Sequence, residues 1–369
     1  MSTLAVNAIT DSTGGNTATI NSATPTVYNT IGKNLVINGA MQIAQRGTSF
    51  TNPSSNSYSV DRFKNFKNTG ATFNISQVTS SPDGFSNSVR IDVTATDDPL
   101  TTNDYLYPFV QGIEGYNLTA LKYGTADAEK LTLSFWVRSN KTGTYIAELQ
   151  NPSKQTSQSY TINSADTWEK KTVTFVGDTS TSLPADNSGR LWLYFYVAAG
   201  PDYQSTSLQT TWSSASTGRA TGQVNLLDST SNYLELTGVQ LEVGESATEF
   251  ERRPYGTELQ LCQRYYEKSY SIDVVPGTAT ANGLVYMSTG TSTAGDKAHT
   301  AFFKVEKRSN PSISYWDSPG NASRVDSGGT NRVGAINFQN TVSVNIRQNA
   351  GGGYGSADLG FHFVASAEL

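Results

Sequence analysis

The sequence predicts an all-β protein in which a two-sheet sandwich of the jelly-roll type is followed by a smaller β-sandwich or barrel. Short runs in which apolar and polar residues alternate recur along the chain. No segment between residues 34 and 250 has the apolar spacing of a helix. Charged residues make up only 15% of the 369 residues, and the many Ser, Thr, Asn and Gly residues are typical of short strands joined by tight turns.

Residues 1–33 form the first segment, and they carry scattered apolar side chains, such as Leu4, Val6 and Ile9, among Thr, Asn, Gly and Ser. A segment of this composition cannot bury enough apolar surface by itself to offset its chain entropy. We therefore expect an N-terminal arm that becomes ordered on a partner. The alternative is an N-terminal segment that stays without fixed structure.

Residues 34–254 are expected to form the jelly-roll domain. Val89, Ile91 and Val93 alternate with polar residues, and the same alternation covers 131–138 and 190–197. Turn sequences separate these runs. About eight strands without intervening helices predict two packed sheets.

The last strand of this domain is predicted to contain a β-bulge. Leu234 and Leu236 share one face of the strand, whereas Val239 and Leu241 have the opposite phase. One extra residue at Thr237-Gly238 would change the phase in this way, because it shifts all following side chains to the other face.

Residues 255–369 are expected to form the C-terminal β domain. After Pro254, Thr257 and Gln260 have the spacing of a capping box, which predicts a short linker helix with Cys262 as a small buried side chain. Six strands are expected after this helix, at 283–287, 302–305, 312–316, 334–338, 342–346 and 359–364.

Composition and motifs exclude several classes of function. The net charge of -5 provides no basic patch for nucleic acid or for an anionic membrane, no apolar run is long enough to span a membrane, and the first thirty residues lack a secretory signal. No nucleophile elbow, metalloprotease motif or phosphate-binding loop occurs. His362 is expected to be a structural histidine. We therefore expect no catalytic residues and no enzymatic activity.

Glycoside hydrolysis is the one enzymatic activity that the number of acidic residues does not exclude. It needs only two carboxylates at a suitable separation, and the chain has 31 Asp and Glu residues. Asp97, Asp98, Glu114 and Glu242 carry no local pattern that distinguishes them.

Aromatic and arginine side chains on the outer faces of predicted strands are the candidate binding residues. They alternate with core-facing residues, so they are either exposed or covered by another molecule. Flat rings stack on the C–H faces of sugars while polar neighbours hold the hydroxyls, which predicts a glycan-binding surface. The other interpretation is a subunit contact or a second core. The candidates are Trp136, Arg138, Arg190, Trp192, Tyr194 and Tyr196.

A structural calcium ion is a further expectation, because such ions are common in jelly rolls. Its candidate ligands are Asn34, Asn38, Gln240 and Glu242, although no dense acidic loop resembles a calcium motif. No other cofactor is expected.

Several segments resemble, in the same order, the fibre and carbohydrate-binding-module-like virion proteins of tailed bacteriophages. NLVINGAMQIAQRGTSF and SYSVDRF resemble the start of these proteins, and FVQGIEG, LTLSFWVRS, TWEKKTVTF and LTGVQLEVG follow. With FFKVEKRSNPSISYWD and FHFVASAEL, the resemblance covers residues 34–369. Phe63 stands where these proteins usually have Trp, and Met41 and Ala44 stand where many have Phe and Trp, which would repack the core near the first strand.

The resemblance implies a virion protein, assembled in the infected host cytoplasm and exposed on the particle surface. It also implies a carbohydrate-binding-like jelly roll, a homotrimer, and an arm at residues 1–33 that docks on tail or capsid proteins. Our leading hypothesis is a tail fibre that binds host surface glycan without catalysis. A purely structural capsid fibre, decoration protein or tail adaptor is the first alternative, and a polysaccharide depolymerase is the second.

Overall fold

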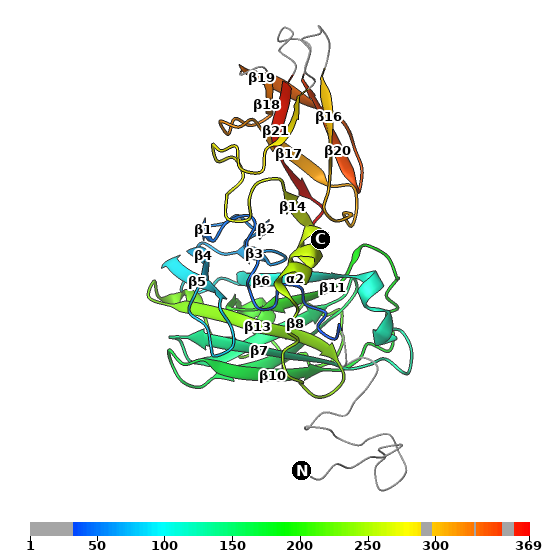
Figure 1. Ribbon diagram of the computed structural model, residues 1–369. Coiled ribbons are helices and arrows are strands. Elements are labelled where there is room, and N and C mark those ends of the chain that lie inside the picture. Colours follow the sequence, from blue (N-terminus) through cyan, green and yellow to red (C-terminus); the bar gives the residue numbers. More distant parts are fainter. Residues whose placement is uncertain (1–31, 289–296, 328–329, 349–357) are drawn as a thin grey trace, which may run out of the picture.

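The computed structural model describes residues 32–288, 297–327, 330–348 and 358–369, which form a two-sheet sandwich and a smaller β domain next to it (Figure 1). The predicted all-β fold class is therefore confirmed. Of the predicted arm at residues 1–33, residues 1–31 lie outside the described residues. No helix in the part of the chain that the structure describes has both the length and the apolar character needed to cross a membrane.

The first sheet of the sandwich has six antiparallel strands, and β13 lies inside it between β5 and β7. In spatial order the strands are β1 (Ser49–Thr51), β4 (Thr72–Val78), β5 (Ser88–Ala95), β13 (Tyr233–Val243), β7 (Leu131–Ser139) and β10 (Glu169–Phe175).

The second sheet has seven strands, and β6 and β11 form its centre. In spatial order the strands are β2 (Ser57–Tyr58), β3 (Lys64–Asn68), β6 (Tyr105–Glu114), β11 (Gly189–Phe195), β8 (Gly143–Gln150) and β9 (Gln155–Ile162), with β12 (Ala198–Ala199) paired to β6. Short helical turns lie in the connections: η1 (Gly115–Asn117), η2 (Thr119–Leu121), α1 (Pro201–Gln204) and η3 (Leu226–Asp228).

The main core lies between the two sheets and consists of the side chains that the alternation directs inward. Leu133 and Phe135 of β7 are fully buried, as are Leu191 and Leu193 of β11. The rings of Phe135 and Phe195 meet edge to face across the core, 5.1 Å apart. The predicted bulge in β13 is confirmed, because the pairing register shifts between Thr237 and Gln240.

The predicted linker helix is α2 (Tyr255–Gln263), which begins directly after Pro254. The expected capping box is wrong, because the helix begins two residues before Thr257 and no side chain caps it. Cys262 is buried beside Ile37 and Tyr265, as expected for a small core side chain.

The C-terminal domain is built on an eight-stranded sheet among the described residues. Its strands are β14 (Tyr266–Lys268), β21 (Asp358–Ser366), β18 (Arg324–Ser327), β19 (Thr330–Gln339), β20 (Ser343–Gln348) and β16 (Ala298–Phe302), with β15 (Val285–Ser288) and β17 (Ser312–Trp316) also paired to β21. The strand predicted at 302–305 is wrong, because β16 ends at Phe302 and the backbone N–H of Lys304 turns to donate to Glu267. β18 was not predicted.

His362 in β21 is the structural histidine that its strand position predicted. It is fully buried and stacks on Tyr270 at 3.8 Å. Its Nε2 lies 2.9 Å from the carbonyl oxygen of Thr280.

Ion pairs join the C-terminal domain to the sandwich. Arg264, at the end of α2, makes two hydrogen bonds of 2.8 Å with Glu114 of β6. Arg62, in the loop before β3, pairs with Glu368, and the chain end lies between the two parts in Figure 1. The helix and the last residues therefore fix the smaller domain on the sandwich.

Candidate functional site

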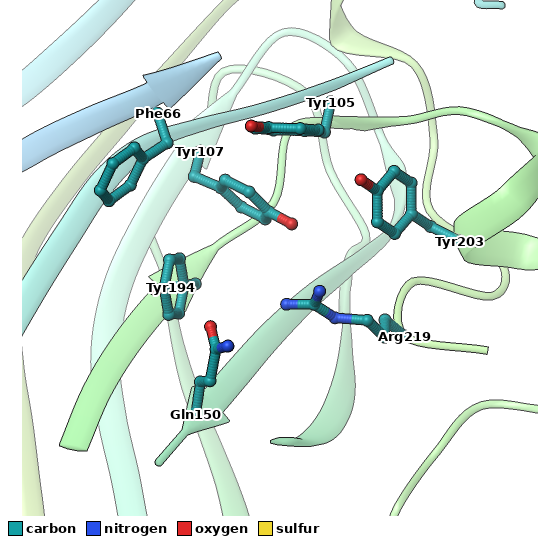
Figure 2. A pocket seen from close by; sticks show the side chains of 7 residues that line it. All are labelled: Phe66, Tyr105, Tyr107, Gln150, Tyr194, Tyr203 and Arg219. Atoms are coloured by element: carbon teal, nitrogen blue, oxygen red, sulfur yellow. The ribbon is translucent and has the colours of Figure 1, made fainter. Parts of the chain in front are cut away.

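The outer face of the second sheet carries a second apolar cluster, separate from the main core. Its buried members include Tyr107, Val110, Ile146 and Tyr196. A cavity of about 220 Å³ opens above this cluster. Figure 2 shows the seven side chains that surround it: Phe66, Tyr105, Tyr107, Gln150, Tyr194, Tyr203 and Arg219.

Strand alternation places most of these side chains. Tyr105 and Tyr107 project from β6 on the face opposite Leu106, a core residue. Phe66 comes from β3 and Tyr194 from β11. Because successive side chains of a strand point to opposite faces, neighbouring strands present their outer aromatics as one surface.

The long connection between β12 and β13 completes the cavity. It carries Tyr203 in α1 and Arg219 in the loop that follows. Gly200 precedes α1, and a Cβ at Gly200 would lie 2.1 Å from the carbonyl oxygen of Thr101, so only glycine allows the connection to pass this close to the start of β6. The backbone N–H of Ala220 donates to the carbonyl of Tyr203 at 2.9 Å, which holds the part of the connection next to Arg219 against α1.

Tyr107 lies at the centre of a group of contacting rings. Its ring centre is 4.9 Å from that of Tyr105, 5.1 Å from Tyr194 and 4.4 Å from Tyr196. Tyr105 also meets Tyr203 edge to face at 5.8 Å. Such aromatic pairs restrict each other's rotation, so the cavity has a preformed apolar wall.

A buried ion pair lies at the base of the cavity. Arg219 makes a two-pronged contact with Glu148, in which Nε donates to Oε2 at 2.8 Å and Nη2 donates to Oε1. Tyr196 also donates to Glu148, and Tyr107 donates to Tyr196 at 2.9 Å. Burial lowers the pKa of Arg219, but the hydrogen bond and charge of Glu148 outweigh this and leave the pKa above its ordinary value.

The tyrosine hydroxyls of this network keep their protons. Burial, reinforced by the negative charge of Glu148, raises the pKa of Tyr107, Tyr194 and Tyr196 above the ordinary value. They are therefore hydroxyl donors and acceptors at neutral pH. Together with Gln150, the hydroxyls of Tyr107 and Tyr194 give the cavity polar groups that do not titrate near neutrality.

The predicted binding residues in β11, and Tyr196 directly after it, have different places relative to this cavity. Tyr194 lines it, and Tyr196 is fully buried beneath it. Trp192 belongs to the same apolar cluster but packs against Gly112 and does not line the cavity. Arg190 is bound to Asp186, with Nε 3.0 Å from Oδ1.

Trp136 and Arg138 lie on the other face of the sandwich, because β7 belongs to the first sheet. The indole of Trp136 packs against Gly238 at the bulge of β13. Arg138 pairs with Glu235, which is fully buried and also pairs with Arg90. The six predicted side chains therefore do not form one surface.

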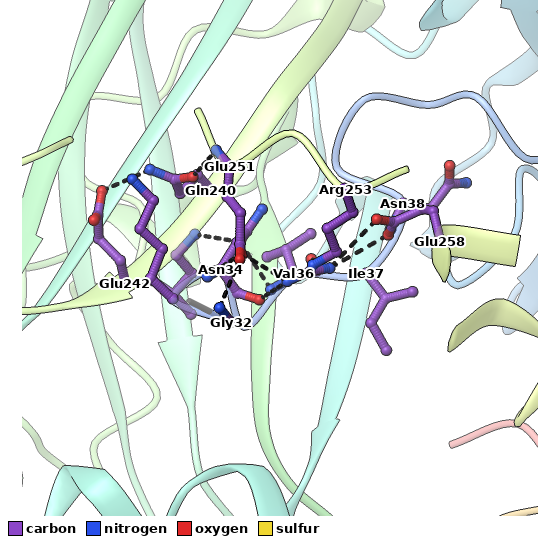
Figure 3. Close-up of polar contacts among 12 residues, drawn as sticks. Gly32, Asn34, Val36, Ile37, Asn38, Gln240, Glu242, Glu251, Arg253 and Glu258 are labelled. Atoms are coloured by element: carbon purple, nitrogen blue, oxygen red, sulfur yellow. Dashed lines mark hydrogen bonds and ion pairs between the residues drawn. The ribbon is translucent and has the colours of Figure 1, made fainter. Parts of the chain in front are cut away.

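The four candidate calcium ligands are occupied by hydrogen-bond donors, and Figure 3 shows these four side chains with part of their hydrogen-bond network. Asn34 Oδ1 accepts from the backbone N–H groups of Val36 and Leu241, and Asn38 Oδ1 accepts from that of Ile43. Gln240 Oε1 accepts from the backbone N–H of Glu251 at 2.7 Å.

Both carboxylate oxygens of Glu242 accept hydrogen bonds from Thr248, one from its backbone N–H and one from its hydroxyl. A cation would therefore face N–H and O–H groups at all four side chains, so these residues do not fit a calcium ion. They fasten the start of the described chain to β13 instead. Among the described residues there is no group of three or more His, Cys, Asp or Glu side chains that could hold a metal.

Six lining residues were not predicted from the sequence: Phe66, Tyr105, Tyr107, Gln150, Tyr203 and Arg219. The alternation of Tyr105 and Tyr107 with Leu106 was a signal that could have found two of them. Tyr203 and Arg219 lie in an aperiodic connection, where no local pattern reports their position.

A scan against protein-family models finds no match for this sequence, and a search of curated proteins finds none either. Among solved structures, the chain is similar to the enzymatically active domain of a bacteriophage CBA120 tailspike, with 14% identity over 57% of this chain and 21% of the tailspike and a TM-score of 0.31. The chain thus spans about a fifth of the tailspike's length.

Two carbohydrate-binding modules are also similar. The family 11 module from Clostridium thermocellum, solved with a β-1,3-1,4-mixed-linked tetrasaccharide, has 12% identity over 55% of this chain and 98% of its own, with a TM-score of 0.28. The module TmCBM61, in complex with β-1,4-galactotriose, has 8% identity over 57% and 99%, with a TM-score of 0.30. TM-scores this low say nothing about function, which has to be inferred from the side chains of the cavity.

Proposed function

We propose that this chain is a non-enzymatic glycan-binding protein of a bacteriophage virion, which recognises host surface glycan at the cavity on the outer face of the second sheet. One observation carries the proposal. Five aromatic rings, four of them tyrosines with hydroxyl groups, surround a preformed cavity together with an arginine and a glutamine. Rings of this kind stack on the C–H faces of sugars, and the polar groups match sugar hydroxyls.

The absence of lining carboxylates favours binding over hydrolysis. Glycoside hydrolysis needs two carboxyl groups on either side of the scissile bond. None of the seven described residues that line the cavity is Asp or Glu, and Glu148 beneath it is held by Arg219 and Tyr196. We therefore infer that the protein binds glycan without cleaving it.

The place of the protein in a phage particle rests on the sequence resemblance. By that resemblance the protein is a homotrimeric tail fibre on the surface of the virion, attached to tail or capsid proteins by residues 1–33. Host glycan, other virion proteins and two further copies of the chain are its proposed partners.

Substitution of the tyrosines that line the cavity tests the proposal. Tyr203→Ala and Tyr105→Ala each remove one ring while leaving the main core intact, because both side chains are only partly buried members of the outer cluster. We expect each variant to reduce binding to extracted host surface polysaccharide by at least about tenfold, since truncation of an aromatic hot-spot side chain costs about 2 kcal/mol or more. Binding is measured by affinity electrophoresis or calorimetry, with release of oligosaccharides assayed in the same samples.

Tyr116→Ala provides the matched control. Tyr116 is 59% exposed in η1 and does not line the cavity, so its loss should leave binding unchanged. Unchanged binding by both cavity variants would refute the cavity as the site. Release of products by the wild-type protein would refute the non-enzymatic part of the proposal.

A purely structural virion role is the second candidate, and exposed apolar side chains of the C-terminal domain favour it. Phe302 is 74% exposed, Tyr286 54% and Phe338 47%. Exposed apolar groups of this size often mark protein interfaces. A folded oligomer that binds no host polysaccharide, and whose assembly is lost in Phe302→Ser, would favour the structural role over glycan recognition.

A further inference from the structure

The charge of the cavity indicates which class of glycan it accepts. Among the seven described lining residues, Arg219 is the single charged side chain. Its charge therefore decides whether the cavity attracts an acidic sugar, such as a uronic or sialic acid, or an uncharged one. The inference below rests on the proposed function and names the ligand of the same cavity.

Glu148 neutralises Arg219 from beneath. The side chain of Glu148 is completely buried and that of Arg219 is 15% exposed, so solvent screens the pair little. Two parallel N–H···O contacts fix the guanidinium in the plane of the carboxylate. Tyr196 and Ser157 complete the hydrogen bonding of Glu148.

Arg219 and Glu148 together carry no net charge, so Arg219 acts on a ligand as a hydrogen-bond donor and not as an unpaired cation. The N–H of Nε and one N–H of Nη2 are directed at Glu148, so both N–H groups of Nη1 and the second N–H of Nη2 are left to donate toward a ligand. Lys64 does not add a charge to the cavity, because it lies against the Phe66 ring, 4.7 Å from its centre, and its Nζ is bound to Asn56 and to the carbonyl of Leu369. Lys64 is not a lining residue.

We propose that the cavity selects uncharged glycans over carboxylated ones, and that Glu148 is the residue that sets this selectivity by neutralising and positioning Arg219. A carboxylated sugar would lose its hydration in the cavity without gaining an unpaired cation, and it would lie close to the buried carboxylate of Glu148. An uncharged sugar incurs neither cost. It can still accept a hydrogen bond from Arg219 Nη1 and stack on the rings.

The test compares uncharged hexose oligosaccharides with their C6-oxidised uronate counterparts, measured on the full chain by calorimetry at low and high salt. We expect the wild-type protein to prefer the uncharged member of each pair by at least about tenfold, with little dependence on salt. Preferential binding of the uronates would overturn the inference but leave the proposed function intact. Binding of neither series would overturn both.

Glu148→Gln tests the role of Glu148 itself. The substitution keeps the shape of the side chain and leaves the charge of Arg219 unpaired, so the preference should fall by about tenfold or reverse, and uronate binding should become salt-sensitive. The double variant Glu148→Gln/Arg219→Gln is the matched control, because its cavity is again uncharged and should keep the wild-type preference.

Two results would contradict the role of Glu148. One is an unchanged preference in a folded Glu148→Gln protein, and the other is a preference that reverses equally in the double variant. Circular dichroism and thermal unfolding establish that each variant is folded. If Glu148→Gln does not fold, Arg219→Gln provides the second test: it removes the one cation among the described lining residues, so the preference for uncharged sugars should persist or strengthen, and a weaker preference would overturn the inference.

Discussion

At the scale of single residues, Asp61 is a buried carboxylate in the contact between the sandwich and the C-terminal domain. Its oxygens accept hydrogen bonds from Gln45 at 2.7 Å and from Arg46 at 3.0 Å. Burial raises the pKa of Asp61 to about 6, although Arg46 and Gln45 act in the opposite direction. The folded protein therefore binds a proton at Asp61 more readily than the unfolded chain does between about pH 4 and about pH 6.

This pKa shift predicts how stability depends on pH. The contribution of Asp61 to the free energy of unfolding should decrease as pH rises from about 4 to about 6, by roughly 3 kcal/mol, and stay constant above that range. Asp61→Asn should remove this slope, which urea unfolding at several pH values measures. Asp127→Asn, at an exposed position, is the control and should keep the wild-type profile. The same slope in Asp61→Asn would contradict the assignment to Asp61.

At the scale of elements, the bend of β13 depends on Gly238. This residue has a φ of +62°, and a Cβ added to it would lie 2.7 Å from the Phe85 ring and 3.0 Å from the Trp136 ring. Gly238→Ala should therefore lower the free energy of unfolding by about 1–3 kcal/mol through backbone strain and crowding. Thermal and chemical unfolding measure the change.

Gly256→Ala is the control for the glycine substitution. Gly256 lies in α2, and a Cβ there meets nothing within 4 Å. The variant should be as stable as the wild type or more stable by up to about 1 kcal/mol, because alanine favours helix. Equal effects of the two substitutions would show that the bulge does not require glycine.

Strand faces could be predicted from the sequence because the period of two is a local property of the backbone. The alternation correctly predicted that Tyr194 points outward. The change of phase after Leu236 correctly predicted the bulge in β13. The sheet that each strand joins is a long-range property. Trp136 and Trp192 have the same local pattern, yet they lie on opposite faces of the sandwich.

The cavity could not be predicted for the same reason. Tyr203 and Arg219 come from a connection without periodicity, and pairing of distant strands decides what they meet. Glu148 and Arg219 are 71 residues apart in the chain, and no local sequence pattern around either residue predicts that they form an ion pair. Whether an outward tyrosine such as Tyr196 is exposed also depends on this connection, which covers it.

At the scale of the whole molecule, Arg62 connects parts of the chain that are far apart in sequence. Its guanidinium pairs with Glu368, donates to the carbonyl of Gly112 at 2.7 Å and lies 3.4 Å from the centre of the Tyr265 ring. Its side chain is 1% exposed. A buried charge with these contacts stabilises the fold only while all its partners are present, so Arg62 couples the sandwich to the C-terminal domain.

Arg62→Met should therefore separate the unfolding of the two parts. The substitution keeps an unbranched apolar stem and removes the charge, which leaves Glu368 with Arg46 as its remaining partner at 2.8 Å. We expect a loss of about 3–5 kcal/mol and two heat-absorption transitions in scanning calorimetry in place of one. Lys130→Met, which removes an exposed pair with Glu245, should cost less than about 1 kcal/mol and keep one transition. A single transition in Arg62→Met at the wild-type temperature would show that the apolar contacts of α2, rather than this charge, hold the domains together.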